Sequence, residues 1–355
     1  MKRLRIAVIG AGIIGREHVT LLRQHPGVEL VAIADVTPQG EALAAECGVA
    51  YHANYQHMLQ TLPLDGAIVA LPNQLHLEAG LHCIAQRVPM LMEKPITDSL
   101  PAALKLTRAA EASGVPLLVG HQRRHSPDIA AAKLSIDQGE LGALVAVSGI
   151  WWMHKNERYF DAEWRKKTGG GPLLINLIHD IDCLRFLCGE VQSVQAAVSN
   201  HVRGFEVEDT AAVILRFANG TLGTFSISDA VPSPYGWDAS SGQALYFPQQ
   251  REDCYFIGGR KASLAVPSLV RWQHEGEGCW FDPLVRHQVR VEIASAYQRQ
   301  LSHFLDVIQD SAAPKVSARD GLMTLAAVHA IQRAAATGRP VELAEVLAEA
   351  EQALA

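Results

Sequence analysis

A glycine-rich turn near the start of the chain constrains its fold more than any other feature. A short apolar strand pattern runs into Gly10, Gly12 and Gly15 in the spacing G-x-G-x-x-G, and a helical pattern follows. Gly10 lets the chain turn off the strand, Gly12 lets a pyrophosphate approach the backbone, and Gly15 allows close helix–strand packing. The free N–H groups at the start of the helix, near Ile13 and Ile14, would face the phosphates. The turn therefore predicts a dinucleotide-binding βαβ unit.

An acidic residue follows the second strand pattern, at the distance that such a unit requires. Asp35 comes directly after the apolar run 28–34, twenty residues beyond Gly15. A carboxylate there accepts hydrogen bonds from the ribose hydroxyls of adenosine. It also repels a 2′-phosphate, and Val36 offers no cation to hold one, so we expect NAD to be preferred over NADP. A plain strand–helix turn with a surface aspartate is the structural alternative.

The first third of the chain alternates strand and helix patterns, which predicts an α/β, doubly wound Rossmann domain. The apolar runs typical of buried parallel strands lie at 5–9, 28–34, 67–71, 90–92 and 117–119. Helical patterns lie between them, at 18–24, 37–47, 56–62, 77–86 and 100–112. We expect this domain to span residues 1–122.

The remainder, residues 123–355, predicts an α+β domain with a large, mostly antiparallel sheet. Helices are expected over 127–137 and 172–187, and strands over 191–198, 211–217, 221–227, 254–257 and 262–266. Asn219-Gly220 between two of these strands is a hairpin signal. Helical periodicity returns at 291–308 and 319–336, and we expect the 319–336 helix to pack back on the first domain. The segment 232–252 is a long loop, either an active-site lid or an ordinary surface loop.

Composition excludes several classes of function. The chain has 355 residues, is 48% hydrophobic and carries a formal charge of -6, with no basic block longer than residues 165–167, so nucleic acid is not an expected partner. No apolar stretch reaches 18 residues, so no membrane span is expected, and the glycine-interrupted N-terminus does not fit a signal peptide. Six scattered cysteines without a C-x-x-C pair indicate reduced thiols in a cytoplasmic protein. The histidines form no metal-ligand spacing, so no metal is expected.

Polar residues follow two of the predicted parallel strands. Leu71, Pro72, Asn73 and His76 come after one strand, and Glu93-Lys94-Pro95 comes after the next. Open α/β sheets bind ligands at the carboxyl ends of their strands. A surface Glu-Lys ion pair would show the same local pattern.

Taken in order, these motifs resemble a known family over nearly the whole chain. They are followed by Gly120-His-Gln-Arg-Arg124 and by Gly169-Gly-Gly171 ahead of His179-x-x-Asp182. This series is similar to the glucose–fructose oxidoreductase and inositol dehydrogenase family (Gfo/Idh/MocA). The resemblance implies NAD(P)-dependent oxidation or reduction of a sugar, cyclitol or related polyhydroxy compound. It also implies that the second domain binds substrate and forms a homodimer or homotetramer through its sheet.

The resemblance also implies roles for individual residues. Lys94 would reach the substrate hydroxyl and the nicotinamide ribose, while Glu93 faces the ribose side. Leu71, Pro72, Asn73 and His76 would line the dinucleotide cleft. Arg123 would bridge cofactor and substrate, and Arg165 is a further substrate-binding candidate. Trp151 is either a stacking platform for a sugar ring or a core residue.

The resemblance implies that His179 is the proton acceptor during alcohol oxidation, a role that neutral imidazole suits; without the resemblance, a single histidine in an apolar helix is more often structural. The chain departs from the family here. The usual aspartate four residues before this histidine is replaced by Ile175, and Asn176 stands beside it as a candidate substrate contact. Asp182 lies one turn beyond His179 and is either its partner or purely structural.

The leading hypothesis is an NAD-dependent dehydrogenase acting on CH–OH groups of a sugar, cyclitol or sugar acid. A redox-neutral hydrolase or lyase that uses NAD transiently on a glycoside is a second hypothesis, and stoichiometric NADH release separates the two. A non-catalytic NAD-binding regulator is a third. Ile175 favours the regulator, whereas Lys94 and His179 oppose it.

Overall fold

The computed structural model describes residues 3–243, 247–276, 278–292 and 294–354, and the chain divides into two compact units. The first unit combines residues 1–122 with 297–325 and 349–355. The second combines residues 123–296 with 326–348. Helix α10 (Ala318–Thr337) therefore contributes its first turns to one unit and its remaining turns to the other.

The first unit is built on a six-stranded sheet in the order β3-β2-β1-β4-β5-β6, and every pairing is parallel. Its strands are β1 (Leu4–Ile9), β2 (Val28–Ala34), β3 (Ala50–His52), β4 (Gly66–Val69), β5 (Met90–Met92) and β6 (Leu117–Val119). This order reverses direction at β1 and β4, which places the ligand crevice of a doubly wound sheet beyond the carboxyl ends of these two strands. The predicted Rossmann sheet is confirmed, and the short strand β3 is an addition to it.

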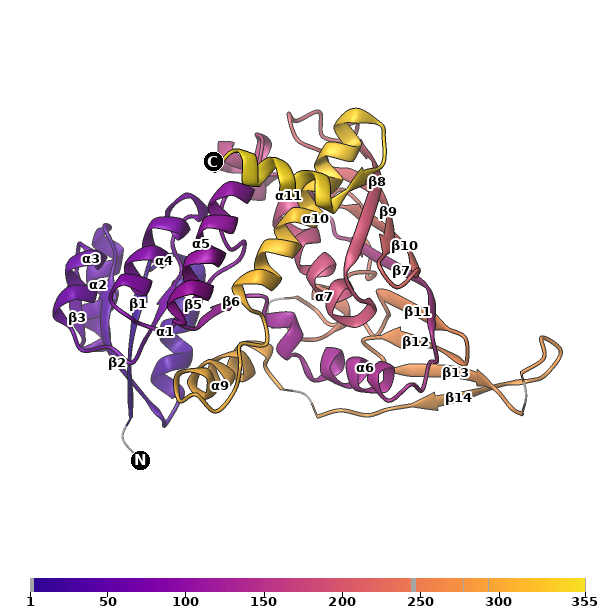
Figure 1. The fold of residues 1–355 in the computed structure, drawn as a ribbon, viewed down its shortest axis with the longest axis horizontal. Helices are drawn as coiled ribbons and strands as arrows, with labels where there is room; N and C mark the ends of the chain where they lie inside the picture. Colours follow the sequence, from indigo (N-terminus) through magenta and orange to yellow (C-terminus); the bar gives the residue numbers. More distant parts are fainter. Residues whose placement is uncertain (1–2, 244–246, 277, 293, 355) are drawn as a thin grey trace. The chain divides into compact units, whose positions relative to one another are not determined.

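Helices connect these strands at almost the predicted positions (Figure 1). They are α1 (Ile13–Gln24), α2 (Pro38–Cys47), α3 (Tyr55–Thr61), α4 (His76–Ala85) and α5 (Leu100–Ser113). Helix α1 starts five residues before the predicted start at His18, directly after Gly12. The first unit also contains nearly all of α9 (Ala296–Ile308), a helix with a strongly apolar stripe. Its Phe304 and Ile308 lie beside Gly66, which leaves room for them because it lacks a side chain.

The second unit is built on a nine-stranded sheet in the order β14-β13-β12-β11-β7-β10-β9-β8-β15. The strands are β7 (Leu144–Trp152), β8 (Val191–Ser199), β9 (Thr210–Phe217), β10 (Leu222–Ser228), β11 (Tyr255–Gly259), β12 (Ala262–Val266), β13 (Val270–His274), β14 (Leu284–Gln288) and β15 (Val341–Glu342). Every pairing is antiparallel except β10 with β7. The predicted, mostly antiparallel sheet is confirmed, and the Asn219-Gly220 hairpin joins β9 and β10, with Gly220 at a φ of 88°.

Helices cover one face of this sheet, and no helix of the described residues covers the other. Helix α6 (Pro127–Asp137) packs on β12, and α7 (Ile178–Cys188) packs on β7 (Figure 1). Along β9 the side chains alternate, with Val213 and Leu215 buried on the helix side and Ile214 exposed on the other. The second unit is completed by the short helix α8 (Trp237–Ser240) and most of α11 (Leu343–Gln352). No described helix is long and apolar enough to cross a bilayer.

The helix predicted over 172–187 begins differently from the expectation. Residues Leu173–Leu177 form a π-helical turn, and regular α-helix starts only at Ile178. A π-turn inserts one extra residue and is often found at functional sites. It lies directly before His179 and contains both Ile175 and Asn176.

Candidate active site

The glycine turn after β1 has the shape that a pyrophosphate needs. Gly10 has a φ of 96°, and a side-chain carbon there would collide with the carbonyl oxygen of Ala70. A side-chain carbon at Gly15 would collide with the carbonyl oxygen of Gly10. At Gly12 the same carbon would meet nothing within 4 Å. The first and third glycines are therefore required by the fold, whereas the open space at Gly12 fits the approach of a phosphate to the start of helix α1.

Ile13 and Ile14 form the first residues of α1, and Ile13 is 90% exposed. An apolar side chain this exposed at a helix start is available to pack against a ligand.

Asp35 is tied to the glycine turn. Its Oδ2 accepts a hydrogen bond from the backbone N–H of Ala11 at 2.6 Å, and its Oδ1 accepts from the N–H of Thr37 at 2.7 Å. Burial raises the pKa of Asp35, but the hydrogen bonds from Thr37 and Ala11 outweigh it and the net pKa is lowered. The carboxylate is thus held in its charged form beside the cofactor turn, and Val36 next to it is exposed.

Glu93 belongs to a buried pair that sequence reasoning did not predict. Its Oε1 lies 2.8 Å from Nε2 of His18 on helix α1, and both side chains are buried. Its Oε2 accepts from the backbone N–H of Lys94 at 3.2 Å. Burial raises the pKa of Glu93, but the hydrogen bond and charge of His18 and the charge of Lys94 outweigh this effect. The net pKa is lowered, so the carboxyl stays ionised. Glu93 therefore links the start of the Lys94 loop to helix α1.

His76 joins the two loops that follow β4 and β5. Its Nε2 lies 2.8 Å from the carbonyl oxygen of Leu71, and its Nδ1 lies 2.9 Å from that of Pro95. The ring is fully buried, and burial lowers its pKa despite the opposing effect of these hydrogen bonds. Pro72 and Asn73 stand between the two anchored ends, with Asn73 opening a 3₁₀ turn. The predicted cleft residues thus lie together at one edge of the sheet, with His76 as a buried brace beneath them.

In the second unit, two arginines hold the helix that carries His179. Arg123 Nη1 donates to Asp180 Oδ1 at 2.7 Å, and Arg124 donates to both oxygens of Asp182 at 2.7 and 2.8 Å. All four side chains are buried. Asp182 pairs with Arg124, which supports the structural role that the sequence left open. Because each ion pair is buried, loss of one partner would leave an uncompensated charge.

The Arg123 pair belongs to a larger network. Tyr255 donates its hydroxyl to Asp180, Arg123 Nη2 lies 3.4 Å from Asp238, and Trp151 Nε1 donates to Asp238 at 2.9 Å. Burial raises the pKa of Asp180, while Arg123 and Tyr255 oppose that rise. Trp151 is 0% exposed, so its ring supports the site from within the core instead of offering a surface. Motif reasoning found Arg123 but not Asp238 or Tyr255, which lie far along the chain and carry no local signal.

Beside Asn176 lies a buried lysine that was also not predicted. Lys155, just beyond β7, donates from Nζ to Asn176 Oδ1 at 2.8 Å and lies 3.5 Å from Asp229 Oδ2. Its ammonium also faces the ring of Tyr159 at 4.6 Å, and the guanidinium of Arg165 lies 4.1 Å from the same ring. Burial lowers the pKa of Lys155 to about 8, against the opposing effect of Asp229. The predicted substrate residues Asn176 and Arg165 are therefore brought together around Lys155.

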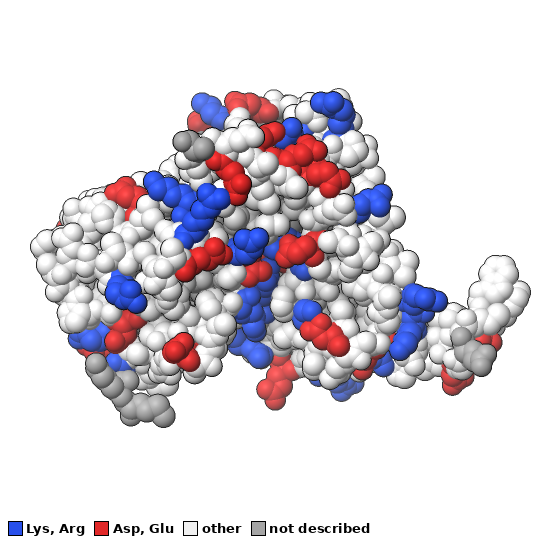
Figure 2. Space-filling model, viewed as in Figure 1, with Lys and Arg blue, Asp and Glu red and all other residues white. Residues whose placement is uncertain are grey.

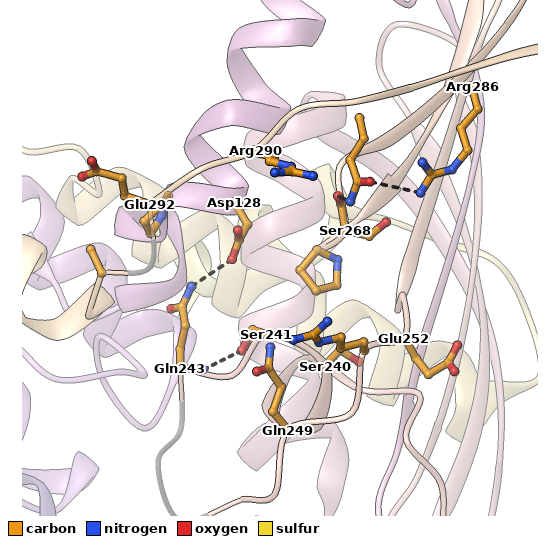
Figure 3. A pocket seen from close by; sticks show the side chains of 15 residues that line it. Asp128, Ser240, Ser241, Gln243, Gln249, Glu252, Ser268, Arg286, Arg290 and Glu292 are labelled. Carbon is orange, nitrogen blue, oxygen red and sulfur yellow. Dashed lines mark hydrogen bonds between the residues drawn. The ribbon is translucent and has the colours of Figure 1, made fainter.

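A separate cavity of about 530 Å³ in the second unit contains none of the predicted site residues. Figure 3 shows Asp128, Gln243 and Arg290 facing it from three different segments. Its charges are mixed, since three arginines (251, 286 and 290) and three carboxylates (128, 252 and 292) line it. Part of the wall comes from the loop 232–252, whose Tyr246 lies outside the described residues. No group of three or more metal-ligating side chains occurs in the described ranges.

The comparisons with known proteins agree with this architecture. Residues 4–121 match the Gfo/Idh/MocA model described as an oxidoreductase family with an NAD-binding Rossmann fold, and residues 133–343 match its C-terminal alpha/beta domain. The chain belongs to the Gfo/Idh/MocA oxidoreductase family. It is therefore an oxidoreductase with an NAD-binding Rossmann domain, as the sequence motifs predicted.

Among its relatives is inositol 2-dehydrogenase 1 of Saccharopolyspora erythraea, 28% identical over 96% of both chains. The scyllo-inositol 2-dehydrogenase (NAD(+)) of Bacillus subtilis is 27% identical over 96% of both chains. The fold is shared with a putative NADPH-dependent oxidoreductase from Desulfitobacterium hafniense, with a TM-score of 0.83, 22% identity and coverage of 98% and 99% of the two chains.

Proposed function

We propose that this chain is an NAD-dependent dehydrogenase that oxidises a CH–OH group of a sugar, cyclitol or sugar acid, or runs the reverse reduction. The observation that carries the proposal is the arrangement at the carboxyl edge of the parallel sheet. The neighbouring strands β1, β4 and β5 end in the glycine turn, the Leu71–Asn73 loop and Glu93-Lys94. The inositol dehydrogenase relatives support a polyhydroxy substrate.

The residues of the first unit fit a bound dinucleotide. Gly12 and the start of α1 would receive the pyrophosphate, Asp35 the adenosine ribose, and Asn73 and Glu93 the nicotinamide end. Bound NAD supplies the acceptor for the hydride that leaves the carbinol carbon. Preference for NAD over NADP follows from the ionised Asp35, because a 2′-phosphate placed against it would be repelled.

Proton transfer is assigned to Lys94 and His179. We propose that the Lys94 ammonium donates a hydrogen bond to the substrate oxygen and so stabilises the charge that develops on it. The His179 imidazole then removes the hydroxyl proton. Arg123 and Arg124 act on His179 indirectly, because their ion pairs with Asp180 and Asp182 hold helix α7.

A panel of polyols, aldoses, uronates and aldonates with NAD, followed by NADH absorbance, tests the proposal. One NADH per molecule of substrate consumed is expected. Product formation without NADH accumulation would instead indicate a redox-neutral enzyme. Failure of every compound, together with intact NADH binding, would favour a regulator.

We also propose a homodimer or homotetramer assembled through the uncovered face of the nine-stranded sheet. Ile214, Leu222, Phe256 and Trp272 are exposed on that face and line a groove of about 700 Å³. An apolar patch that spans several strands is unusual on a monomer. In sedimentation experiments, Phe256→Lys should shift the protein to monomer. Leu134→Lys, on the exposed side of α6, is the control that should not.

We propose a cytoplasmic location, since all six cysteines are free thiols, four of them buried. Reduced cysteines are typical of that compartment. Fractionation of the native cells tests it.

A further inference from the structure

The second unit presents hydrogen-bond donors at the position where the family resemblance implies a carboxylate. Ile175 replaces the usual aspartate, and the polar groups beside it are Asn176, Lys155 and Arg165. The family's aspartate would be an acceptor with a negative charge. Here Asn176 and Arg165 add donors beside a lysine whose charge is already balanced by Asp229, and this bears on which substrate the site can hold.

Lys155 fixes the orientation of Asn176. An ammonium can only donate, so the Asn176 atom 2.8 Å from Nζ must be the amide oxygen. The amide NH₂ group therefore points away from Lys155, and no described residue accepts a hydrogen bond from it. Asn176 lies in the π-helical turn and His179 in the first turn of α7, three residues later in the sequence.

Lys155 is itself held in place by buried partners. Asp229 accepts from Arg203 Nε at 2.8 Å and lies near the lysine Nζ, and its backbone oxygen accepts from the Lys155 N–H at 2.9 Å. The ring of Trp151 lies 5.6 Å from Nζ on another side. Lys155 is 8% exposed. A buried cation with this many contacts has one preferred position, so it can hold the amide of Asn176 rigidly.

Arg165 adds a second donor to the same neighbourhood. Its guanidinium and the Lys155 ammonium both contact the ring of Tyr159. Its Nε is buried and has no hydrogen-bond partner among the described residues. Because this nitrogen is enclosed, a ligand would have to meet Arg165 through its Nη groups, of which Nη1 already donates to the carbonyl oxygen of Tyr159. A planar, charged acceptor is the group that guanidinium recognises best.

We propose that Asn176, oriented by Lys155, and Arg165 recognise a carboxylate of the substrate, so that the enzyme acts on hydroxy acids such as uronates or aldonates in preference to neutral sugars and cyclitols. The proposal deepens the dehydrogenase function and rests on it. Lys155 is a positioning residue in this scheme, because it acts through Asn176.

The test compares matched pairs that differ only in the acid group: D-galacturonate with D-galactose, and D-glucuronate with D-glucose, with myo-inositol as a neutral cyclitol. Binding to the enzyme–NADH complex is measured by calorimetry, and turnover with NAD is measured separately. We expect the acid of at least one pair to bind 10- to 100-fold more tightly than its neutral partner, the range of a charge-assisted hydrogen-bond pair. Equal binding within every pair, or no acid binding at millimolar concentration, would overturn the inference.

Variants assign the effect to these residues. Asn176→Asp keeps the shape of the side chain but replaces the donors with a negative acceptor, and it should abolish the acid preference. Lys155→Met should reduce the acid preference about tenfold, with little change in the binding of the neutral partner. Lys166→Met is the control, since it removes a nearby cation whose Nζ pairs with Glu163 and not with Asn176 or Asp229, and it should keep the preference. An equal loss for both members of a pair in Lys155→Met would show a purely structural lysine.

Separate measurements of binding and turnover distinguish a failure of the carboxylate site from a failure of the dehydrogenase function. Acid preference in binding without NADH formation would leave the carboxylate site standing and remove the dehydrogenase function. NADH formation without acid preference would support the dehydrogenase function and overturn the carboxylate site.

Discussion

Gly12 and Gly15 belong to the same motif, but replacing each by alanine should have a different effect. The change at Gly15 should lower stability, whereas the change at Gly12 should mainly weaken NADH binding. A methyl group at Gly15 would overlap the carbonyl oxygen of Gly10 and lie 2.9 Å from its carbonyl carbon. Backbone cannot yield as a flexible side chain does, so we expect a loss of about 2 kcal/mol or more in unfolding free energy. NAD binding should fall as well, because the turn itself is displaced.

At Gly12 the methyl group would enter open space. Gly12 is the N-cap of α1 with a φ of -66°, which alanine can adopt. The poorer capping of alanine costs about 0.5–1 kcal/mol, and the reduced entropy of the unfolded chain returns about 0.4–1 kcal/mol. Stability should therefore change by less than about 0.5 kcal/mol. The methyl group would, however, occupy the space proposed for the pyrophosphate, and NADH affinity should drop at least tenfold, or about 1.4 kcal/mol.

Thermal unfolding of the apo protein and fluorescence titration with NADH measure the two effects. We expect Gly15→Ala to melt several degrees lower and Gly12→Ala to melt with the wild type but bind NADH weakly. If Gly12→Ala bound NADH with wild-type affinity, the pyrophosphate would lie elsewhere and the assignment of this turn would be wrong.

Three further predictions concern the proposed roles of single residues. Asp35→Ser with Val36→Arg should move the kcat/KM preference toward NADP, by removing a repulsion and adding a phosphate partner; equal wild-type kcat/KM for the two cofactors would contradict the NAD assignment. Lys94→Ala should lower kcat/KM by roughly 10²–10⁴ with much less effect on NADH affinity; near wild-type turnover would reduce Lys94 to a surface charge. His179→Ala should remove most activity and the acid limb of the pH–rate profile, and an unchanged limb would place the titrating base on another residue.

Much of the first unit could be predicted because its signals are local. The glycine turn, Asp35 and the alternating apolar runs each lie within a few residues, and parallel strands buried on both faces are uniformly apolar. The contribution of α9 to the same unit has no such signal. Its Phe304 packs beside Gly66 across more than two hundred residues, and nothing near either residue indicates the other.

The second unit was less predictable at its sheet edge and in its interior. Strand β14 ends in Arg286, His287 and Gln288 and lacks the apolar alternation of a half-buried strand, while β13 alternates only over Val270–Gln273. Strand β7 contains Gly149, whose missing side chain is replaced by the ring of Phe225. The connection between β13 and β14 carries the exposed Trp280 and Phe281, and the projection at the right edge of Figure 2 shows both uncharged and acidic side chains.

In the candidate site, too, local motifs could be predicted and long-range contacts could not. Motifs single out Lys94 and His179 as predicted catalytic residues, but the contacts around them come from tertiary packing. His18 lies one turn inside a helix that the glycine motif already explained, and its pairing with Glu93 spans 75 residues. Lys155 follows a strand as an isolated basic residue, which is indistinguishable in sequence from a surface lysine. Only the three-dimensional structure shows that it is buried and in contact with Asn176.

The proton on Lys155 gives the carboxylate proposal a pH dependence. Burial lowers its pKa to about 8, while Asp229 opposes the shift and Arg203 and Arg165 add to it. Tyr159 faces the same ammonium, and Glu208 interacts with it from the side of the π-turn. From pH 7 to pH 9 the lysine should therefore pass from about nine-tenths to about one-tenth protonated. The neutral amine can accept as well as donate, so it no longer holds Asn176 in one orientation.

Acid preference should fall as the pH rises through this range. The preference is expressed as the ratio of kcat/KM for the acid to kcat/KM for its neutral partner. In this ratio the pH dependence of the hydride step cancels, because both substrates share it. In Lys155→Arg the guanidinium keeps its charge, so the ratio should stay high between pH 7 and 9. In Lys155→Met no group titrates there, and the ratio should stay low and flat. A wild-type ratio that is constant over this range, or one that falls equally in Lys155→Arg, would show that Lys155 does not orient Asn176 for substrate.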